Sequence, residues 1–455
     1  MPLSRRHFIA AGAASALGAA ARRAPNIVLI FCDDLGYGDL GCYGGALATP
    51  NIDRIAREGM RFTNAVSANP VCSPSRAALM TGRYPTRAGV PNVLFPRDEK
   101  GMPLEEVTLA DILKEKGYKT ACVGKWHLGH RPDYLPTRRG FDRYFGIPYS
   151  NDMKPAVVMD NESVSEPEAT QDTLTERYTA RAVKFIDDNA SSPFFLYFPH
   201  TFPHIPLYAS QRFRGKSPHG IYGDVMAEVD WSVGEVLAAL KRHNLDRDTL
   251  VLFSSDNGPW YQGSPGPYRG RKGMTWEGGV RVPFLARQPG TVKTGVSGAL
   301  VSLMDVMPTA AAHCGAAPRR PVDGVDIRGI LTGAQPQVER DVLLYFDSWN
   351  LQCARRGDWK LHLARYNNVT YSPAPEGGRV NLPLAKPELY NLKTDPAESY
   401  DVAARHPEIV SEIRARAEEL LKGFPEEPRR AYAETMKRPA TDPPAGALPQ
   451  RRASS

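Results

Sequence analysis

The sequence predicts an α/β fold in which a mostly parallel sheet is flanked by helices, followed by a smaller C-terminal α+β subdomain. Two observations carry this prediction. Short, continuously apolar runs bounded by turn residues are typical of strands buried on both faces of a parallel sheet, and amphipathic helical patterns fall between these runs. The length of 455 residues suits one large domain with a smaller partner.

Four apolar runs are expected to form the core strands: 26–32, 119–123, 194–198 and 250–255. Apolar spacing of three and four predicts helices at 108–116, 173–189 and 224–243. Gly117 follows the first of these helices as its C-cap. In open parallel sheets, ligands bind beyond the carboxyl ends of the strands. The polar residues that follow these runs are therefore the first candidates for a functional site.

The sequence changes character near residue 335. Short strands are expected at 342–346, 359–363 and 388–392, with a helix at 409–421. From Phe424 onward, the abundance of Pro, Arg, Ala and Ser predicts a disordered tail. We therefore divide the chain after residue 24 into a catalytic domain (25–335), a C-terminal antiparallel-sheet subdomain (336–423) and a tail (424–455).

Residues 1–24 are similar to a twin-arginine export signal. Arg5-Arg6 precede a weakly apolar, Ala-rich run, and Ala19-Ala20-Ala21 offer a small-residue cleavage site. The alternative is an Ala-rich start without an export role. The run is too short to span a bilayer, and no later segment is apolar enough to do so. We expect a bacterial, periplasmic or secreted protein that is not membrane-spanning and has the twin-arginine export machinery as a partner.

Charge and cysteine content narrow the function classes. The net charge of +7 favours anionic substrates. No basic run is interleaved with aromatic residues, so nucleic-acid binding is not expected. The six cysteines form no CxxC pair, which disfavours a thiolate zinc site. A protein exported in folded form is expected to have few or no disulfides.

Two acidic pairs follow two of the predicted strands. Asp33-Asp34 come directly after 26–32, and Asp256-Asn257 after 250–255. Either pair alone is best explained as a turn. Together, at one edge of a sheet, their oxygen donors suit a hard cation such as Ca²⁺ or Mg²⁺. A cation would also remove the cost of gathering carboxylates there.

Basic residues in separate loops are expected to surround this cation. Alternation along an extended segment would place Lys125 and His127 on one face. With Arg76, His204 and Lys272 they would form a cationic pocket, whereas each alone is more often solvated or structural. Such a pocket suits a sulfuryl group, whose three peripheral oxygens carry charge in the transition state.

The most specific motif is Cys72-Ser-Pro-Ser-Arg76, which runs on into Thr81-Gly82-Arg83. With this motif and the segments 103–108, 124–129, 136–142 and 276–281, the chain resembles the formylglycine-dependent sulfatases of the alkaline phosphatase superfamily. The similarity is greatest to the arylsulfatase A and N-acetylgalactosamine-6-sulfatase branch. It extends from about residue 26 to 421.

The resemblance implies that a maturation enzyme oxidises Cys72 to formylglycine, which hydrates to a geminal diol. One hydroxyl of the diol would attack sulfur, and the other would expel sulfate and regenerate the aldehyde. The resemblance also implies that Asp33, Asp34, Asp256 and Asn257 are ligands of Ca²⁺, with Mg²⁺ as an alternative. Asp256 would in addition take the attacking proton.

The resemblance assigns roles to the basic residues as well. Arg76 and Lys125 resemble the pair that holds the diol in its charged form, and His127 resembles the base for sulfate expulsion. His204 and Lys272 resemble the sulfate contacts, one of which serves as acid for the leaving oxygen. A helix starting near Pro74 would keep Cys72 and Arg76 within one turn.

The predicted function is hydrolysis of a sulfate ester on a carbohydrate or an aryl group. Three alternatives remain: a phosphonate monoester or phosphodiester hydrolase with the same signal and fold, an inert sulfated-glycan binder, and a two-zinc phosphatase. The last is disfavoured because a second, His-rich metal set is not evident.

Specificity is expected to come from loops at 90–102, 130–170 and 258–272. Trp260 and Tyr261 would stack on a sugar or simply pack within their loop. We interpret Arg97, Arg131, Arg269 and Arg271 as solvated surface arginines, and His200 is left between a site and a structural role.

Overall fold

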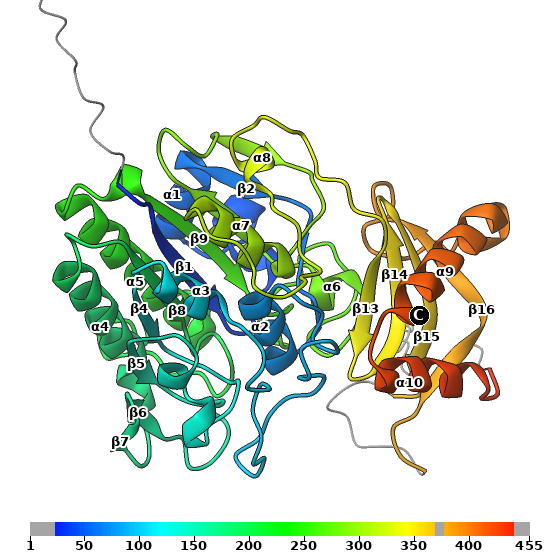
Figure 1. The fold of residues 1–455 in the computed structure, drawn as a ribbon, viewed down its shortest axis with the longest axis horizontal. Helices are drawn as coiled ribbons and strands as arrows, with labels where there is room; N and C mark the ends of the chain where they lie inside the picture. Colours follow the sequence, from blue (N-terminus) through cyan, green and yellow to red (C-terminus); the bar gives the residue numbers. More distant parts are fainter. Residues whose placement is uncertain (1–22, 369–376, 441–455) are drawn as a thin grey trace, which may run out of the picture.

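A computed structural model describes residues 23–368 and 377–440 of the chain. Two layers of helices enclose a large twisted sheet, and a smaller sheet with two helices lies at one side (Figure 1). Residues 1–22, which hold the predicted export signal, lie outside the described part. No helix among the described residues combines the length and apolar character needed to cross a membrane.

The large sheet has ten strands in the order β11-β2-β10-β9-β1-β8-β4-β5-β6-β7. The parallel centre consists of β1 (Asn26–Cys32), β4 (Lys119–Val123), β5 (Arg143–Gly146), β8 (Phe194–Pro199) and β9 (Thr249–Ser255). The outer strands are β2 (Met60–Phe62), β6 (Val158–Asp160), β7 (Ser163–Glu166), β10 (Phe284–Arg287) and β11 (Gly295–Ser297). β3 (Ala65–Val66) pairs with β12 (Val301–Ser302) in a separate two-stranded sheet. The mostly parallel α/β architecture is confirmed.

Alternate residues of β1 face two different cores. Ile27 and Leu29 pack in the core under α2 (Cys72–Thr81), α3 (Leu109–Glu115) and α7 (Val306–His313). Val28 and Ile30 pack in the core under α1 (Pro50–Glu58), α4 (Leu174–Asp188) and α5 (Gly220–Arg242). Two short helices, α6 (Glu277–Val280) and α8 (Arg328–Leu331), complete this part of the chain. Burial on both faces explains why the strand is apolar throughout.

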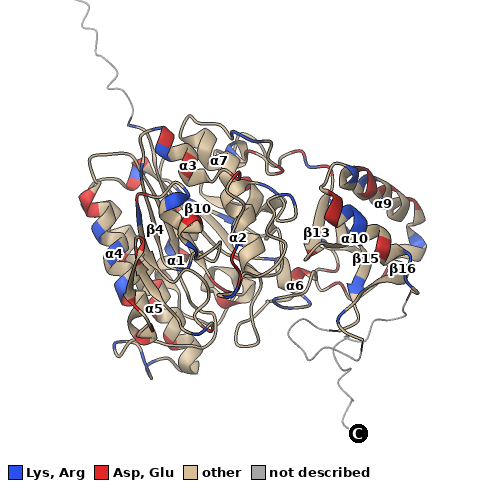
Figure 2. Ribbon diagram, turned by 60° about the horizontal axis from the view of Figure 1, so that its bottom comes forward, with Lys and Arg blue, Asp and Glu red and all other residues tan. Residues whose placement is uncertain are grey.

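The C-terminal sheet is antiparallel, in the order β13-β14-β15-β16. Its strands are β13 (Leu343–Asp347), β14 (Asn350–Arg356), β15 (Trp359–Tyr366) and β16 (Asn381–Asn391), and α9 (Pro407–Lys422) packs on it. Acidic and basic residues alternate along the outer helices, as on α9 (Figure 2). The sequence did not predict β14. This strand carries polar residues such as Gln352 and Arg355, whose burial depends on tertiary hydrogen bonds.

The prediction that the chain is disordered from Phe424 is wrong for residues 424–436. Glu426–Met436 form helix α10, which packs on β14 and β16. Phe424 is buried against Tyr84 and Phe346, and the hydroxyl of Thr435 accepts a 3.2 Å hydrogen bond from the Asn381 amide. These contacts with distant segments outweigh the local composition. Residues 441–455 of the predicted tail lie outside the described residues.

Candidate active site

The motif cysteine lies at the first residue of a completely buried helix. Cys72 opens α2, two residues before the predicted start at Pro74, and Arg76 follows one turn later. The Sγ atom lies 3.5 Å from Asp33 Oδ1. Burial raises the pKa of the Cys72 thiol strongly, and the nearby Lys125 and Lys272 only partly oppose this effect. The side chain is therefore a protonated thiol, which is a poor nucleophile.

Arg76 connects the two acidic strand ends. Its Nε and Nη2 donate to Asp256 Oδ2 at 3.1 and 2.8 Å, and Nη2 lies 3.4 Å from Asp33 Oδ1. Its Nη1 donates to the Lys125 carbonyl at 3.1 Å. Because Asp33 follows β1 and Asp256 follows the neighbouring β9, parallel pairing brings them to the same sheet edge. The predicted convergence of these carboxylates is confirmed.

Lys125 reaches the same edge from the loop after β4. Its Nζ donates to Asp33 Oδ2 at 2.5 Å and to the Ser150 hydroxyl at 3.1 Å. Burial alone would raise the pKa of Asp33, but Lys125, His204 and Arg76 hold it well below its usual range. Ser150 was not predicted, because a single serine after an apolar loop has no distinguishing sequence signal.

The reason given for placing Lys125 and His127 on one face is wrong. Residues 124–129 form no strand, and His127 has a left-handed φ of 59° between Gly124 and Gly129. Both side chains nevertheless reach the site. His127 Nε2 donates to the Leu94 carbonyl at 2.9 Å, while its buried Nδ1 has no hydrogen-bond partner. Burial, with Lys125 and Arg76, lowers the pKa of His127 well below its usual value. The ring is therefore neutral, with a lone pair on Nδ1.

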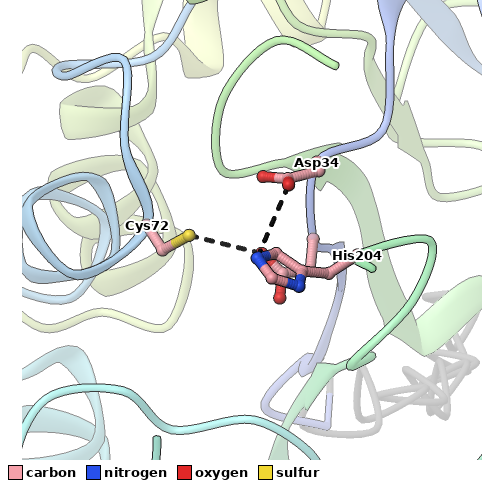
Figure 3. Close-up of side chains that lie close together, drawn as sticks. Asp34, Cys72 and His204 are labelled. Atoms are coloured by element: carbon pink, nitrogen blue, oxygen red, sulfur yellow. Dashed lines mark hydrogen bonds and ion pairs between the residues drawn. The ribbon is translucent and has the colours of Figure 1, made fainter. Parts of the chain in front are cut away.

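His204 and Lys272 converge on Asp34 from two loops. Lys272 Nζ donates to Asp34 Oδ2 at 2.9 Å, and His204 Nε2 lies 3.6 Å from the same oxygen. Figure 3 shows Cys72, Asp34 and His204 directed toward one another. Asp34 has a left-handed φ of 61°, a conformation that non-glycine residues hold mainly where the surroundings enforce it.

The acidic residues fit a hard cation. Asn257 Oδ1 is buried without a hydrogen-bond partner, although its amide donates to Asp34 Oδ1 at 2.8 Å. Burial and the neighbouring Asp33 raise the pKa of Asp256 to about 7, although Arg76 opposes this effect. Oxygen donors of this kind suit Ca²⁺ or Mg²⁺.

A second set of donors overlaps this one. Ligand atoms of Asp33, Asp34, Cys72 and His204 lie within 4.8 Å of one another. A sulfur and a nitrogen beside carboxylates would suit Zn²⁺. We favour the all-oxygen set because it includes the buried Asn257 Oδ1, which has no hydrogen-bond partner. The carboxylate and amide oxygens at this sheet edge thus fit the cation predicted from the two acidic pairs.

A cavity of about 150 Å³ opens onto these residues. Its lining includes the motif cysteine and the polar residues described above: Cys72, Asp34, His127, Ser150, His204 and Lys272. The other lining residues are Val93, Phe95, Asp152, Met153, Ile205 and Trp260. The three loops predicted to govern specificity therefore all contribute to the lining. Tyr261 lies beside Trp260, with ring centroids 4.9 Å apart, and is not among the lining residues.

Three further residues that the sequence placed near the site have structural roles. His200 is completely buried beside Phe198 and does not line the cavity. Arg269 stacks over Trp276 at 3.9 Å and Arg271 donates to two carbonyls of the 260–263 loop. The interpretation of these two arginines as solvated is therefore wrong, because stacking and backbone hydrogen bonds hold them against the protein.

Comparisons with known proteins agree with this geometry. The Sulfatase family model matches residues 25–316, and the model for the C-terminal region of aryl-sulfatase matches residues 338–449. Arylsulfatase A of Homo sapiens is 39% identical over 451 residues, covering 88% of each chain. N-acetylgalactosamine-6-sulfatase of Canis lupus familiaris is 38% identical, covering 86% of this chain and 84% of that one.

Solved structures include the PsFucS1 sulfatase from Pseudoalteromonas sp., with a TM-score of 0.80, 29% identity and 92% of each chain covered. The fold, the buried motif cysteine and the family matches lead to one conclusion. The chain belongs to the sulfatase family and is a sulfuric ester hydrolase.

Proposed function

We propose that this enzyme hydrolyses the sulfate ester of a carbohydrate or an aryl group, using a formylglycine derived from Cys72 and one divalent cation. The observation that carries the proposal is the state of Cys72. Cys72 opens the buried helix α2 and lines the cavity among charged residues, while burial raises the pKa of its thiol. Those surroundings suit a nucleophile, but the thiol itself does not.

Formylglycine supplies two hydroxyl groups on one carbon when hydrated, one to attack sulfur and one to release sulfate. Arg76 and Lys125 lie near this position, where they would stabilise a charged form of the attacking group. His127 Nδ1 is the atom suited to accept a proton, since the neutral ring already donates from Nε2. Asp256 would accept the proton of the attacking hydroxyl.

Asp33, Asp34, Asp256 and Asn257 would hold the cation, with Ca²⁺ as the first choice and Mg²⁺ as the alternative. The cation would supply positive charge to the sulfate oxygens. Lys272 and His204 line the cavity beside Asp34 and would contact the sulfate, and one of them would protonate the leaving oxygen.

Export and maturation form part of the proposal. We infer from Arg5-Arg6 and the following Ala-rich run that the chain is exported to the periplasm or beyond by the twin-arginine route. That route carries folded proteins, so the maturation enzyme would have to oxidise Cys72 in the cytoplasm. Fractionation of wild type and an Arg5→Lys/Arg6→Lys variant tests export: the variant should accumulate in the cytoplasm.

Mass spectrometry of the peptide containing Cys72, from protein made in its own cell type, is the direct test. The proposal expects the mass of formylglycine in active protein. An unmodified thiol in fully active protein would overturn it. Turnover of sulfate monoesters should exceed turnover of phosphonate monoesters and phosphodiesters. The reverse order would favour the alternative hydrolase, and formylglycine without hydrolysis of any sulfate ester would favour the inert glycan binder.

A further inference from the structure

Part of the lining of the active-site cavity consists of apolar side chains without a role in the chemistry described above. Val93, Phe95, Met153, Ile205 and Trp260 line the cavity beside the nucleophile and the sulfate contacts. Phe95 is 39% exposed, although its side chain is large and apolar. Ligand sites are typically apolar and aromatic, with a few placed polar groups that fix orientation. We call these five residues the apolar wall.

Hydrogen bonds fix the apolar wall relative to the reacting groups. The backbone N–H of Leu94 donates to the Ser73 hydroxyl at 3.1 Å, next to Cys72, and the Leu94 carbonyl accepts from His127. On the other side, Arg271 donates to the carbonyls of Trp260 and Gly263 at 2.8 and 2.7 Å. A wall fixed in this way loses little conformational freedom when it binds a ligand.

A carboxylate completes this part of the cavity. Asp152 is exposed, lines the cavity, and makes no hydrogen bond or ion pair with the described part of the chain. The described residues that line the cavity include no arginine, and Lys272 is already bonded to Asp34. A second negative group on the substrate would therefore meet the Asp152 carboxylate, which has no ion-pair partner among the described residues. The exposed Arg97 guanidinium lies over the Phe95 ring, 5.0 Å from its centroid, but it is not among the residues that line the cavity.

The cavity volume limits the size of the leaving group. About 150 Å³ is similar to an engineered protein cavity that holds one benzene molecule. The site can therefore enclose the sulfate and part of one adjoining ring, and the rest of a larger substrate must remain in solvent.

We propose that the apolar wall and Asp152 form the leaving-group subsite, and that it selects an uncharged ring, sugar or aryl, bearing a single sulfate. One ring face packs on Trp260 and Phe95, and a hydroxyl or amide N–H of the ring donates to Asp152. Rings with a second sulfate or a carboxylate are disfavoured. This inference rests on the proposed function.

The test uses matched substrates that differ by one charge. The aryl pair is 4-nitrophenyl sulfate and 3-carboxy-4-nitrophenyl sulfate, and the sugar pair is N-acetylgalactosamine 6-sulfate and its 4,6-disulfate. For wild type, kcat/KM should favour the singly charged member of each pair by about five- to tenfold, the scale of one partly screened charge contact. Asp152→Asn should reduce this preference to within about twofold, mainly through KM for the doubly charged member.

Two further variants separate the subsite from general effects. Glu99→Gln removes an exposed carboxylate that does not line the cavity, and it should preserve the wild-type preference. Trp260→Leu should raise KM for the singly charged substrates by about three- to tenfold with little change in kcat. Tyr261→Leu alters the neighbouring ring outside the lining and should have a smaller effect.

Three results would overturn the inference. These are a wild type that prefers the doubly charged substrates, an unchanged preference in Asp152→Asn, and an equal loss of preference in Glu99→Gln. Each of them leaves the sulfatase proposal standing, because sulfate is still released. By contrast, formylglycine-bearing protein that cleaves neither member of either pair but cleaves phosphodiesters would overturn the proposed function and the subsite together.

Discussion

Two clusters of buried acidic and basic side chains among the described residues differ in the buried polar atoms that they leave without a partner. The catalytic cluster contains Asp33, Asp34, Asp256, Arg76, Lys125 and Lys272. The interdomain cluster contains Glu277, Glu398, Arg281, Arg355 and Lys360. It lies where α6 meets the C-terminal sheet (Figure 1).

The interdomain cluster is closed on itself. Lys360 Nζ lies 3.0 Å from Glu277 Oε1 and 3.2 Å from Glu398 Oε1, and it donates to the Thr275 carbonyl at 2.7 Å. The Glu277 N–H donates to Glu398 Oε2 at 2.6 Å, and Arg281 forms an ion pair with Glu277. None of the side-chain polar atoms of these described residues is buried without a partner.

The catalytic cluster is bordered by two buried atoms without partners, Asn257 Oδ1 and His127 Nδ1. A buried polar atom without a hydrogen bond lowers the unfolding free energy by about 1–3 kcal/mol. These two atoms therefore do not serve stability. Buried charged side chains therefore serve two different purposes in this protein. The interdomain cluster holds two sheets together, whereas the catalytic cluster keeps atoms available for a cation and a reacting group.

The sharpest way to separate the two clusters is Cys72→Ala. Loss of the nucleophile should lower kcat for sulfate esters on the order of 10⁵–10⁶-fold, as for removal of other catalytic nucleophiles. The midpoint of denaturant unfolding should change little, because the substitution removes only the aldehyde oxygen of formylglycine, or the sulfur of any unmodified cysteine. Measurable residual turnover above about 1% of wild type would show that the nucleophile lies elsewhere.

Lys360→Met should produce the opposite result. Removing this lysine leaves Glu277 and Glu398 short of positive charge in a buried site, which typically costs about 3–5 kcal/mol of unfolding free energy. Lys386→Met is the matched control, since Lys386 is exposed on β16 of the same sheet. Urea unfolding measures both variants. A loss below about 1 kcal/mol for Lys360→Met would contradict a structural role for the interdomain cluster.

Cation binding should affect only the catalytic cluster. In Cys72→Ala, where turnover is absent, Ca²⁺ at about a hundredfold over its Kd should add about 2.7 kcal/mol of stability. Asn257→Ala in the same background should weaken this response, because it removes the buried oxygen that lacks a partner. Thermal unfolding with EDTA and then with added Ca²⁺ measures the effect. An equal response with and without Asn257 would exclude that residue as a ligand.

The elements that could be predicted are those whose own residues show by their apolar pattern that they are buried. The span of β1 agrees residue for residue with the apolar run 26–32, since a strand covered on both faces must be apolar throughout. By contrast, β14 and α10 depend on distant partners such as Asn381, which bonds to Thr435. Their own residues are too polar to reveal burial without the fold.

The site shows the same division. The acidic pairs and the motif cysteine were predictable because each follows a strand or lies in a specific motif. Ser150 and Asp152 were not, since a serine or an aspartate in a loop acquires its role only when folding brings it beside Lys125 or the apolar wall. The left-handed φ of His127 could not be predicted either, because surrounding contacts impose that conformation.

The smallest expected effect concerns His200, a buried imidazole that belongs to neither cluster. Burial lowers its pKa from 6.5 to about 3, so below pH 6.5 the unfolded chain binds a proton that the folded protein does not. The unfolding free energy should therefore be unaffected by His200 above pH 6.5. Between pH 6.5 and pH 3 it should fall as the pH falls, by at most about 1.4 kcal/mol per pH unit from this residue.

His200→Leu should flatten that slope between pH 7 and pH 5, a window above the ordinary range of carboxylates. The buried Asp256, whose pKa is raised to about 7, titrates in this window in both proteins, so the difference between their slopes reports on His200. Urea unfolding at several pH values gives the slope independently of any change in absolute stability. His362, in contact with the interdomain cluster through Glu398, also has a pKa well below its usual value because of burial and nearby Arg365 and Lys360. It should add a similar slope, which persists in His200→Leu. If His200→Leu kept the full wild-type slope, the folded protein would have to hold His200 charged, and burial without a partner would not control its titration.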